Sequence, residues 1–359
     1  MSAQKSPQKA FLKRFYANKG GVMGMVLISL AFIIALLAYL IAPDNSPNAN
    51  RMIPEIGSKK PGFSVKLLLI KKEKIATPLF SSLINGKPDE NQYIPILSFL
   101  INKDTLYYEK LVDEGIGQSL KIPVAQTAKT PVMNQKFYLG TDKFGRDILS
   151  RLIIGVRVSL GVGLIAVAIS LTIGILLGAL AGYYRGKVDD IIMWLINVVW
   201  SIPTLLLVFA ITLALGKGFW QVFIAVGLTM WVNVARLVRG QILSIREMEY
   251  IQATKALGYS AMRSIFIHIL PNIMGPVMVI AASNFASAIV IEAGLSFLGV
   301  GVQPPQPSWG LMMKENYNFI ITNNPMLALA PGIAIMLLVL AFNLLGNALR
   351  DAFNVRGKV

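Results

Sequence analysis

The chain is built of long apolar runs separated by polar segments. Six runs reach or approach the about 20 residues that a helix needs to cross the hydrocarbon core of a bilayer. None of them carries a charged residue in its interior. The pattern predicts an all-α polytopic membrane protein with six transmembrane helices, since helices satisfy their own backbone polar groups in lipid. The runs are Val22–Ala42, Val158–Gly182, Ile191–Gly216, Gly218–Ala235, Asn272–Ile291 and Pro325–Leu349.

Two features modify this simple pattern. Pro203 lies inside the third run and predicts a kink, because proline cannot donate to the helix ladder. Between the first and second runs, Pro43–Lys136 mixes Gly, Pro and charge with short apolar stretches. Within it, Val65–Lys72 and Ser119–Val124 are typical of strands, whereas Tyr107–Glu114 favours a helix. We expect a small α/β or β-rich insert, with a partly ordered loop as the alternative.

The distribution of Lys and Arg predicts the orientation. Short loops on one side of the runs are basic, including the segment with Arg236, Arg239 and Arg246 and the tail with Arg350. The opposite short loops hold only Lys217 and Lys314. By the positive-inside rule both termini are cytoplasmic and the insert is extracytoplasmic. The first run is longer than the apolar part of a signal peptide and no small-residue cleavage site follows it, which favours a retained span over a cleaved signal.

Composition supports a membrane location and excludes several other classes. The chain is 55% hydrophobic and only 14% charged, against about 25% charged residues in soluble domains. The net charge is +16, but the basic residues flank the apolar runs, so this charge does not indicate a nucleic-acid surface. With no cysteine and one histidine, His268, a Cys- or His-built metal site is not expected. No phosphate-binding loop and no nucleophile elbow occurs, so we expect no catalytic residues and no cofactor on this chain.

The segment from Glu249 to Pro271 is the most informative. Apolar and small residues recur at helical spacing in its first part, and Gly258 stands where a helix would end. Ser260 can cap a second helix, and Pro271 either closes that helix or opens the next span. Such a short amphipathic helix suits insertion into the groove of a partner. The expected face consists of Tyr250, Ala253, Thr254 and Leu257.

This segment resembles the cytoplasmic loop of ABC-importer permeases. In that pattern Glu-Ala-Ala is followed after three residues by Gly and, after nine more, by Ile-x-Leu-Pro. The matching positions here are Gln252-Ala253-Thr254, Gly258, His268, Leu270 and Pro271. The spacing is kept, but Gln, Thr and His replace Glu, Ala and Ile, so a salt bridge from position 252 to an ATPase is in doubt. An interfacial hairpin without a partner is the structural alternative.

Two further stretches resemble the peptide/nickel branch of this family. The first, before the second run, contains Asp142, Gly145, Arg146 and Asp147. Asp147 and Arg151 are one helical turn apart and could pair. The second resembles the external loop of these permeases and could contact a binding protein, cover the pore mouth or be purely structural, with a tryptophan suited to the membrane interface. Its residues are Pro304, Pro305, Pro307, Ser308, Trp309 and Gly310.

Polar residues inside the runs are candidates for the transport pathway. Amides are costly to bury in lipid, so Asn284, Asn343 and Asn347 should face protein or water. Asn343 and Asn347 share one helix face and could line a pathway or hold helices together. Glu292, near the outer end of the fifth run, could be solvated or take part in gating.

The resemblance implies the type I ABC importer permease fold and a C-type permease subunit of the bacterial inner membrane. It implies a homologous B-type permease, two ATPase subunits that use ATP and Mg²⁺, and an extracytoplasmic substrate-binding protein. The expected layout is tail 1–21, first span 22–42, insert 43–136, core 137–349 with the coupling loop 240–271, and tail 350–359.

The substrate class implied is oligopeptides or dipeptides, with nickel chelates or glycans as alternatives. An ATP-independent transporter or channel is the rival function, although no span holds an ion-relay carboxylate. A surface-interaction or assembly protein built around the insert is a second rival.

Overall fold

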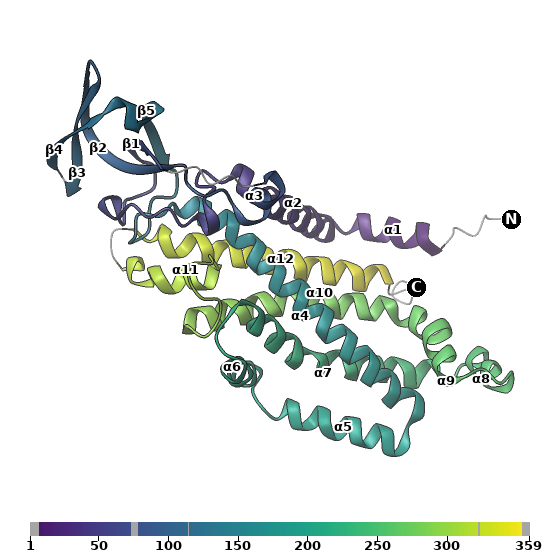
Figure 1. Cartoon of the computed structure of the whole chain (residues 1–359). Coiled ribbons are helices and arrows are strands. Elements are labelled where there is room, and N and C mark those ends of the chain that lie inside the picture. The colour runs from purple at the N-terminus through teal and green to yellow at the C-terminus, as the bar shows by residue number, and fades with distance from the viewer. Residues whose placement is uncertain (1–6, 73–77, 114, 322–323, 354–359) are drawn as a thin grey trace. The chain divides into compact units, whose positions relative to one another are not determined.

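The computed structural model describes residues 7–72, 78–113, 115–321 and 324–353. The chain divides into two compact units, each assembled from distant segments. One contains Met1–Phe32, Ser159–Gln303 and Ile335–Val359, and the other contains Ile33–Val158 and Pro304–Ala334. Figure 1 locates the helices and strands along the chain.

The described residues contain five helices that are long and apolar enough to cross a membrane. A bent pair of shorter helices would make a sixth span if it crosses as one unit. The chain is therefore a helical polytopic membrane protein with five or six apolar spans. The five are α2 (Lys19–Ile41), α4 (Ile148–Tyr184), α7 (Phe219–Ile245), the continuous α9–α10 (Ala261–Leu298) and α12 (Met326–Phe353), and the bent pair is α5 (Gly186–Trp200) with α6 (Thr204–Leu215).

The expected kink at Pro203 is a full break. Helices α5 and α6 meet at 90°, and Pro203 caps the start of α6. Proline lacks the N–H of the helix ladder and keeps the preceding residue out of the helical region, so the chain turns at this point. Other helices are longer than their apolar runs: for example, α4 begins at Ile148 and α7 continues past Ala235 to Ile245. Hydrophobicity marks the lipid-covered length of a helix, whereas its hydrogen-bonded length also includes polar turns.

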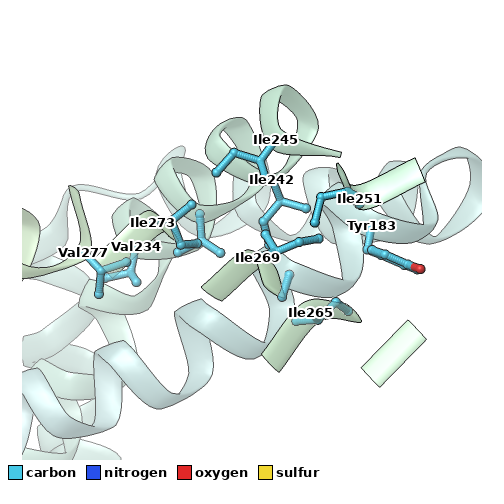
Figure 2. Close-up of a cluster of buried hydrophobic side chains, with 11 residues drawn as sticks. Tyr183, Val234, Ile242, Ile245, Ile251, Ile265, Ile269, Ile273 and Val277 are labelled. Atoms are coloured by element: carbon cyan, nitrogen blue, oxygen red, sulfur yellow. The ribbon is translucent and has the colours of Figure 1, made fainter. Parts of the chain in front are cut away.

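Helix α4 packs against α7 along a row of glycines. A Cβ atom on Gly178 would lie 2.4 Å from the carbonyl oxygen of Ala235, and one on Gly174 or Gly182 would also collide with α7. The spacing of four places the three glycines on one face, where small residues let membrane helices approach closely. The contact continues into a buried apolar cluster that unites α4, α7 and α10 with the short helix α8 (Glu249–Ala256) (Figure 2).

A five-stranded antiparallel sheet lies in the expected insert. Its order is β4-β3-β2-β1-β5, and alternate side chains such as Leu68, Ile96 and Leu106 form a buried layer on it. A small sheet is therefore present in this segment, together with the short helix Leu79–Asn85. The strands are β1 (Phe63–Lys71), β2 (Asn91–Asn102), β3 (Thr105–Asp113), β4 (Ile116–Pro123) and β5 (Thr127–Phe137).

The expected helix over Tyr107–Glu114 is wrong. Thr105–Asp113 is the strand β3, paired on both sides with β2 and β4, and Glu114 lies outside the described residues. Leu106, Tyr108 and Leu111 are buried, and pairing with two neighbouring strands outweighs the weak local preference for a helix. The two expected strands are confirmed, as β1 and β4.

The remaining elements are short. They are α1 (Pro7–Ala17), α3 (Leu79–Asn85), α11 (Trp309–Asn316), the 3₁₀ turns Pro47–Ala49, Pro54–Ile56, Val124–Gln126 and Tyr317–Ile320, and a π-helical turn at Ser264–Ile269 between α9 (Ala261–Arg263) and α10 (Leu270–Leu298).

Candidate functional site

Helix α8 exposes one apolar edge and buries another. Ile251 is fully buried and Thr254 is nearly so, and the Thr254 hydroxyl donates to the carbonyl oxygen of Ile251 at 2.7 Å. Tyr250, Ala253 and Leu257 are exposed, Leu257 to 71%. The sequence placed Thr254 on the same face as these three residues, and the structure assigns it to the buried edge. We call Tyr250, Ala253 and Leu257 the α8 ridge.

Gly258 ends the helix with a left-handed turn, as expected. Its φ angle is +75°, a conformation that costs residues with a side chain. The N–H of Gly258 donates to the carbonyl of Lys255 at 2.9 Å, and the N–H of Tyr259 donates to that of Thr254 at 3.0 Å. This pair of bonds is the Schellman motif, which satisfies the last carbonyls of a helix. Gln252 is exposed and its amide donates to the Glu247 carbonyl at 3.2 Å.

The chain then turns directly into the next span. The Ser260 hydroxyl accepts from the N–H of Arg263 at 3.3 Å, as a helix cap does. Pro271 opens α10 and does not close the preceding helix, which was the other expectation. The Leu270 N–H reaches back five residues to the Ile265 carbonyl. This wide π-helical turn lets the helix run on through the proline, whose missing N–H cannot complete an α-helical turn.

The buried edge of α8 is fixed by the cluster in Figure 2. Ile251 packs with Ile265 and Ile269 of the π-helical turn, and with Ile242 and Ile245 of α7. Basic residues surround the exposed side of α8. The pKa of Lys255 is lowered by its partial burial and, in addition, by the positive charge of nearby Arg246. A rigid base and an exposed ridge are together suited to transmitting a push from a docked partner.

A cavity of about 920 Å³ lies between α5, α6, α7, α10 and α12. Asn284 and Asn343, both expected pathway residues, line it, and so does Asn233. Asn343 is exposed and makes no hydrogen bond to the described part of the chain. Asn347 is also exposed, but it does not line the cavity.

The environment of Glu292 differs from the one expected from the sequence. Its side chain is fully buried and does not line the cavity. The Ser296 hydroxyl donates to Oε1 of Glu292 at 2.6 Å, and the N–H of Val302 donates to the same hydroxyl at 3.0 Å. Glu292 thus belongs to a hydrogen-bonded corner at the end of α10, and the expectation that it is solvated is wrong.

Arg236 is a cavity residue that the sequence did not single out. It entered the sequence argument only as one of the basic residues that set the orientation, yet it lines the cavity beside Trp200. Its guanidinium lies 3.6 Å from the centre of the Trp200 ring. The sequence shows both Pro203 and Arg236, but it does not show that Arg236 contacts Trp200. Only the fold brings these two residues together.

The residues before α4 form a turn held by buried charges. Asp142 accepts from the N–H groups of Phe144 (2.9 Å) and Arg146 (3.0 Å), and from Nε of Arg146 (2.5 Å). Gly145 has a φ of +74°, and a Cβ there would lie 1.8 Å from the carbonyl oxygen of Ile53. Only glycine fits this position, which explains the spacing of the motif.

The expected pair between Asp147 and Arg151 is wrong. Asp147 instead caps α4 by accepting from the N–H and the hydroxyl of Ser150. Burial raises the pKa of Asp147, against the opposing effect of these Ser150 bonds. Arg151 lies 3.6 Å from Glu315, which also binds Arg146 at 2.8 Å. The carboxylate that balances these buried arginines comes from α11, more than 150 residues away.

The proline-rich loop anchors α11. Pro304 and Pro305 are exposed, whereas Pro307, Ser308, Trp309 and Gly310 are buried. The Ser308 hydroxyl caps α11 by accepting from Leu311 at 3.1 Å. Trp309 does not face an interface: it is 3% exposed and donates to the Leu152 carbonyl at 3.0 Å. The buried half of this motif therefore has a structural role.

Sequence comparisons place these features in a known context. Residues 174–358 match the family described as "Binding-protein-dependent transport system inner membrane component". Residues 6–56 match the N-terminal TM domain of oligopeptide transport permease C. The sheet β1–β5 lies between these two matched regions.

Individual relatives agree with the family match. The chain is 37% identical over 303 residues to the dipeptide transport system permease protein DppC of Alkalihalophilus pseudofirmus, covering 80% of this chain and 99% of that one. It is 43% identical over 223 residues to the di/tripeptide transport system permease protein DppC of Pseudomonas aeruginosa, covering 62% and 73%. It is 38% identical over 217 residues to the oligopeptide transport system permease protein OppC of Bacillus subtilis, covering 60% and 71%.

A solved structure of the MetNI methionine ABC transporter in inward-facing conformations also matches. The TM-score is 0.49 at 19% identity, covering 58% of this chain and 98% of that chain.

Proposed function

This chain belongs to the family of binding-protein-dependent transport system inner membrane components, and we propose that it forms one half of the membrane pathway of a peptide importer. As a member of that family it is a membrane permease subunit of an ABC transporter, and the ATPase is a separate subunit. ATP and Mg²⁺ would therefore act on the partner ATPases and not on this chain. The relatives named as dipeptide and oligopeptide permeases support peptides as the substrate class.

The assembly would contain a homologous B-type permease, two ATPase subunits and an extracytoplasmic substrate-binding protein. The subunit would lie in the bacterial cytoplasmic membrane with six spans, the bent pair α5–α6 acting as one, and with both termini cytoplasmic. The basic short loops support this orientation, which puts the sheet β1–β5 on the extracytoplasmic side. The layout proposed is the tail 1–21, first span 22–42, insert 43–136, core 137–349 and tail 350–359.

The observation that carries the proposal is the exposed α8 ridge on its rigid base. Tyr250, Ala253 and Leu257 would enter a groove on the ATPase, as an amphipathic helix enters a partner groove. Glu249 and Gln252 would lie at the rim of this contact, and Thr254, Gly258, Leu270 and Pro271 would fix the geometry of the loop.

The proposed mechanism is alternating access. Closure of the ATPases on ATP would move α8 as a lever, and its packing on α7 and α10 would transmit that movement to the spans around the cavity. Asn284 and Asn343 would line the pathway, and the exposed Asn347, one turn further along α12, would extend it. On the other side, the exposed prolines 304 and 305 would meet the binding protein, while the turn at Asp142–Asp147 holds α4 in place.

Cross-linking tests the proposal directly, because the chain has no cysteine of its own. We expect Ala253→Cys, paired with a cysteine in the groove of the co-expressed ATPase, to form a cross-link whose yield changes with ATP. Val188→Cys is the control, since Val188 is exposed at the start of α5 on the same predicted side of the membrane. Absence of a cross-link from position 253, and also from 250 and 257, in a membrane-inserted complex would contradict the proposal and favour an ATP-independent transporter.

A further inference from the structure

Among the described residues, the wall of the cavity includes one charged side chain. Among the described residues that line it, Arg236 is a cation and all others are neutral; no carboxylate faces the space. Arg236 belongs to α7, one of the apolar spans. It directly follows the apolar run that ends at Ala235, so it lies at the predicted cytoplasmic end of this span.

Among the described residues, Arg236 has no counter-ion. In the described part of the chain its one hydrogen bond runs from Nη2 to Oδ1 of Asn197, at 3.3 Å, and Nε is buried without a partner. The Trp200 ring supports one face of the guanidinium at 3.6 Å. By contrast, Arg239 donates two bonds to the carboxylate of Asp189, at 2.5 and 2.6 Å. Arg239 is therefore paired with a carboxylate, whereas the guanidinium of Arg236 can bind an anion that enters the cavity.

The neutral polar groups on the wall match a peptide backbone. Asn233 and Asn343 present exposed amides, and Ser283 and Ser287 present exposed hydroxyls one turn apart on α10. None of these four side chains hydrogen-bonds to the described part of the chain. An asparagine amide both donates and accepts, as a peptide group does. The cavity thus combines unpaired amide-binding groups with one cation.

From this arrangement we propose that Arg236 binds the terminal carboxylate of the transported solute, so that the pathway prefers peptides with a free C-terminus. This inference rests on the proposed function and adds a specificity-determining residue to it. A guanidinium offers paired N–H donors to a carboxylate, and the stacked Trp200 holds its plane in position. A carboxylate that binds here also neutralises the charge of Arg236.

The first test compares two probes that differ only at the C-terminus. ATP-driven uptake of trialanine and of trialanine amide is measured with the whole complex in proteoliposomes, for the wild-type chain and for each variant. The binding protein is the same throughout, so its own preference cancels in the ratio of variant to wild type. Arg236→Gln should lower the acid-to-amide uptake ratio about tenfold, equivalent to about 1.4 kcal/mol. Arg236→Lys should retain most of the ratio, because it keeps the charge.

Lys187→Gln is the matched control, since it removes an exposed cation outside the cavity, and its ratio should equal that of the wild type. An equal loss of both uptakes in Arg236→Gln, or no change in either, overturns the inference and leaves the proposed function intact. A wild-type complex that imports neither probe with ATP contradicts the proposed function itself, and this inference with it.

A second measurement needs no change at Arg236. Ser283→Cys places a single thiol on the facing wall of the cavity, and its labelling rate by a neutral maleimide is followed in the purified complex. Trialanine should slow the labelling severalfold at concentrations where trialanine amide does not. Equal protection by the two probes, or protection by neither, would overturn the role of Arg236.

Discussion

At the scale of single residues, two buried arginines depend on one carboxylate that is distant in the sequence. Arg146 and Arg151 are each 1% exposed and share the carboxylate of Glu315. Arg146 has a second partner in Asp142 at 2.5 Å, whereas Nη1 and Nη2 of Arg151 make no hydrogen bond to a described residue. Two arginines cannot be buried together without such a counter-charge, because desolvation of each ion is costly. Glu315 is therefore a structural requirement of the turn before α4.

Removal of that carboxylate should destabilise this region strongly. We expect Glu315→Gln to cost about 3 kcal/mol, the lower end of the usual loss when one partner of a buried pair is removed, since Asp142 still balances Arg146. The loss is measured as a lower midpoint of thermal unfolding in detergent. Lys87→Gln is the control, because it breaks only the exposed pair with Glu90 and should cost less than about 1 kcal/mol. Equal midpoints for the two variants would contradict the role of Glu315.

At the scale of elements, the turn after α8 depends on backbone conformation rather than on space. A Cβ on Gly258 would meet nothing within 4 Å, yet its φ of +75° is unfavourable for residues with a side chain. The Schellman bonds at this turn set the angle at which α9 and α10 leave α8.

Substitution of Gly258 should thus act through strain alone. We expect Gly258→Ala to cost about 1 kcal/mol, which makes local opening of α8 about fivefold more frequent. Hydrogen exchange of the α8 amides measures this opening. Gly258→Asn should cost less although its side chain is larger, since asparagine tolerates this conformation. A larger effect from Asn than from Ala would show that space, and not φ, limits the position.

At the scale of the whole molecule, the sheet region and the segments that support α4 are joined by a few polar contacts, chiefly Arg51 with Asp89 at 3.0 Å and Lys110 with Glu55 at 2.9 Å. Residues 43–58 belong to the support: Ser58 donates to the Asp142 carbonyl at 2.8 Å, and Ile53 to that of Phe144 at 3.1 Å. The sheet itself begins at Phe63 and ends at Phe137, which are directly paired neighbours on β1 and β5. Paired residues in antiparallel strands lie about 5 Å apart, so a tight turn can join them.

Replacement of residues 64–136 by Asn-Gly, combined with Arg51→Gln because Asp89 is removed with the sheet, should therefore preserve the permease. We expect the shortened chain to assemble with its partners and to retain ATP-driven uptake, because the cavity and α8 use no residue of the sheet. Deletion of the whole of residues 43–136 should fail to assemble, since it also removes the support of the Asp142 turn. Loss of assembly in the shorter excision, with normal membrane insertion, would instead indicate a protein whose main role is interaction through the sheet.

The sequence by itself determined what depends on neighbours along the chain. Length and hydrophobicity predicted the spans, Pro203 the break, and Gly258 with Ser260 the turn after α8, because lipid burial and backbone conformation act locally. Tertiary structure decided the rest. It made Thr105–Asp113 a strand through pairing on both sides, gave Arg146 a partner on α11, buried Glu292 and Trp309, and brought Arg236 into the cavity. Each of these outcomes depends on residues that are distant in sequence, whose contacts no local pattern encodes.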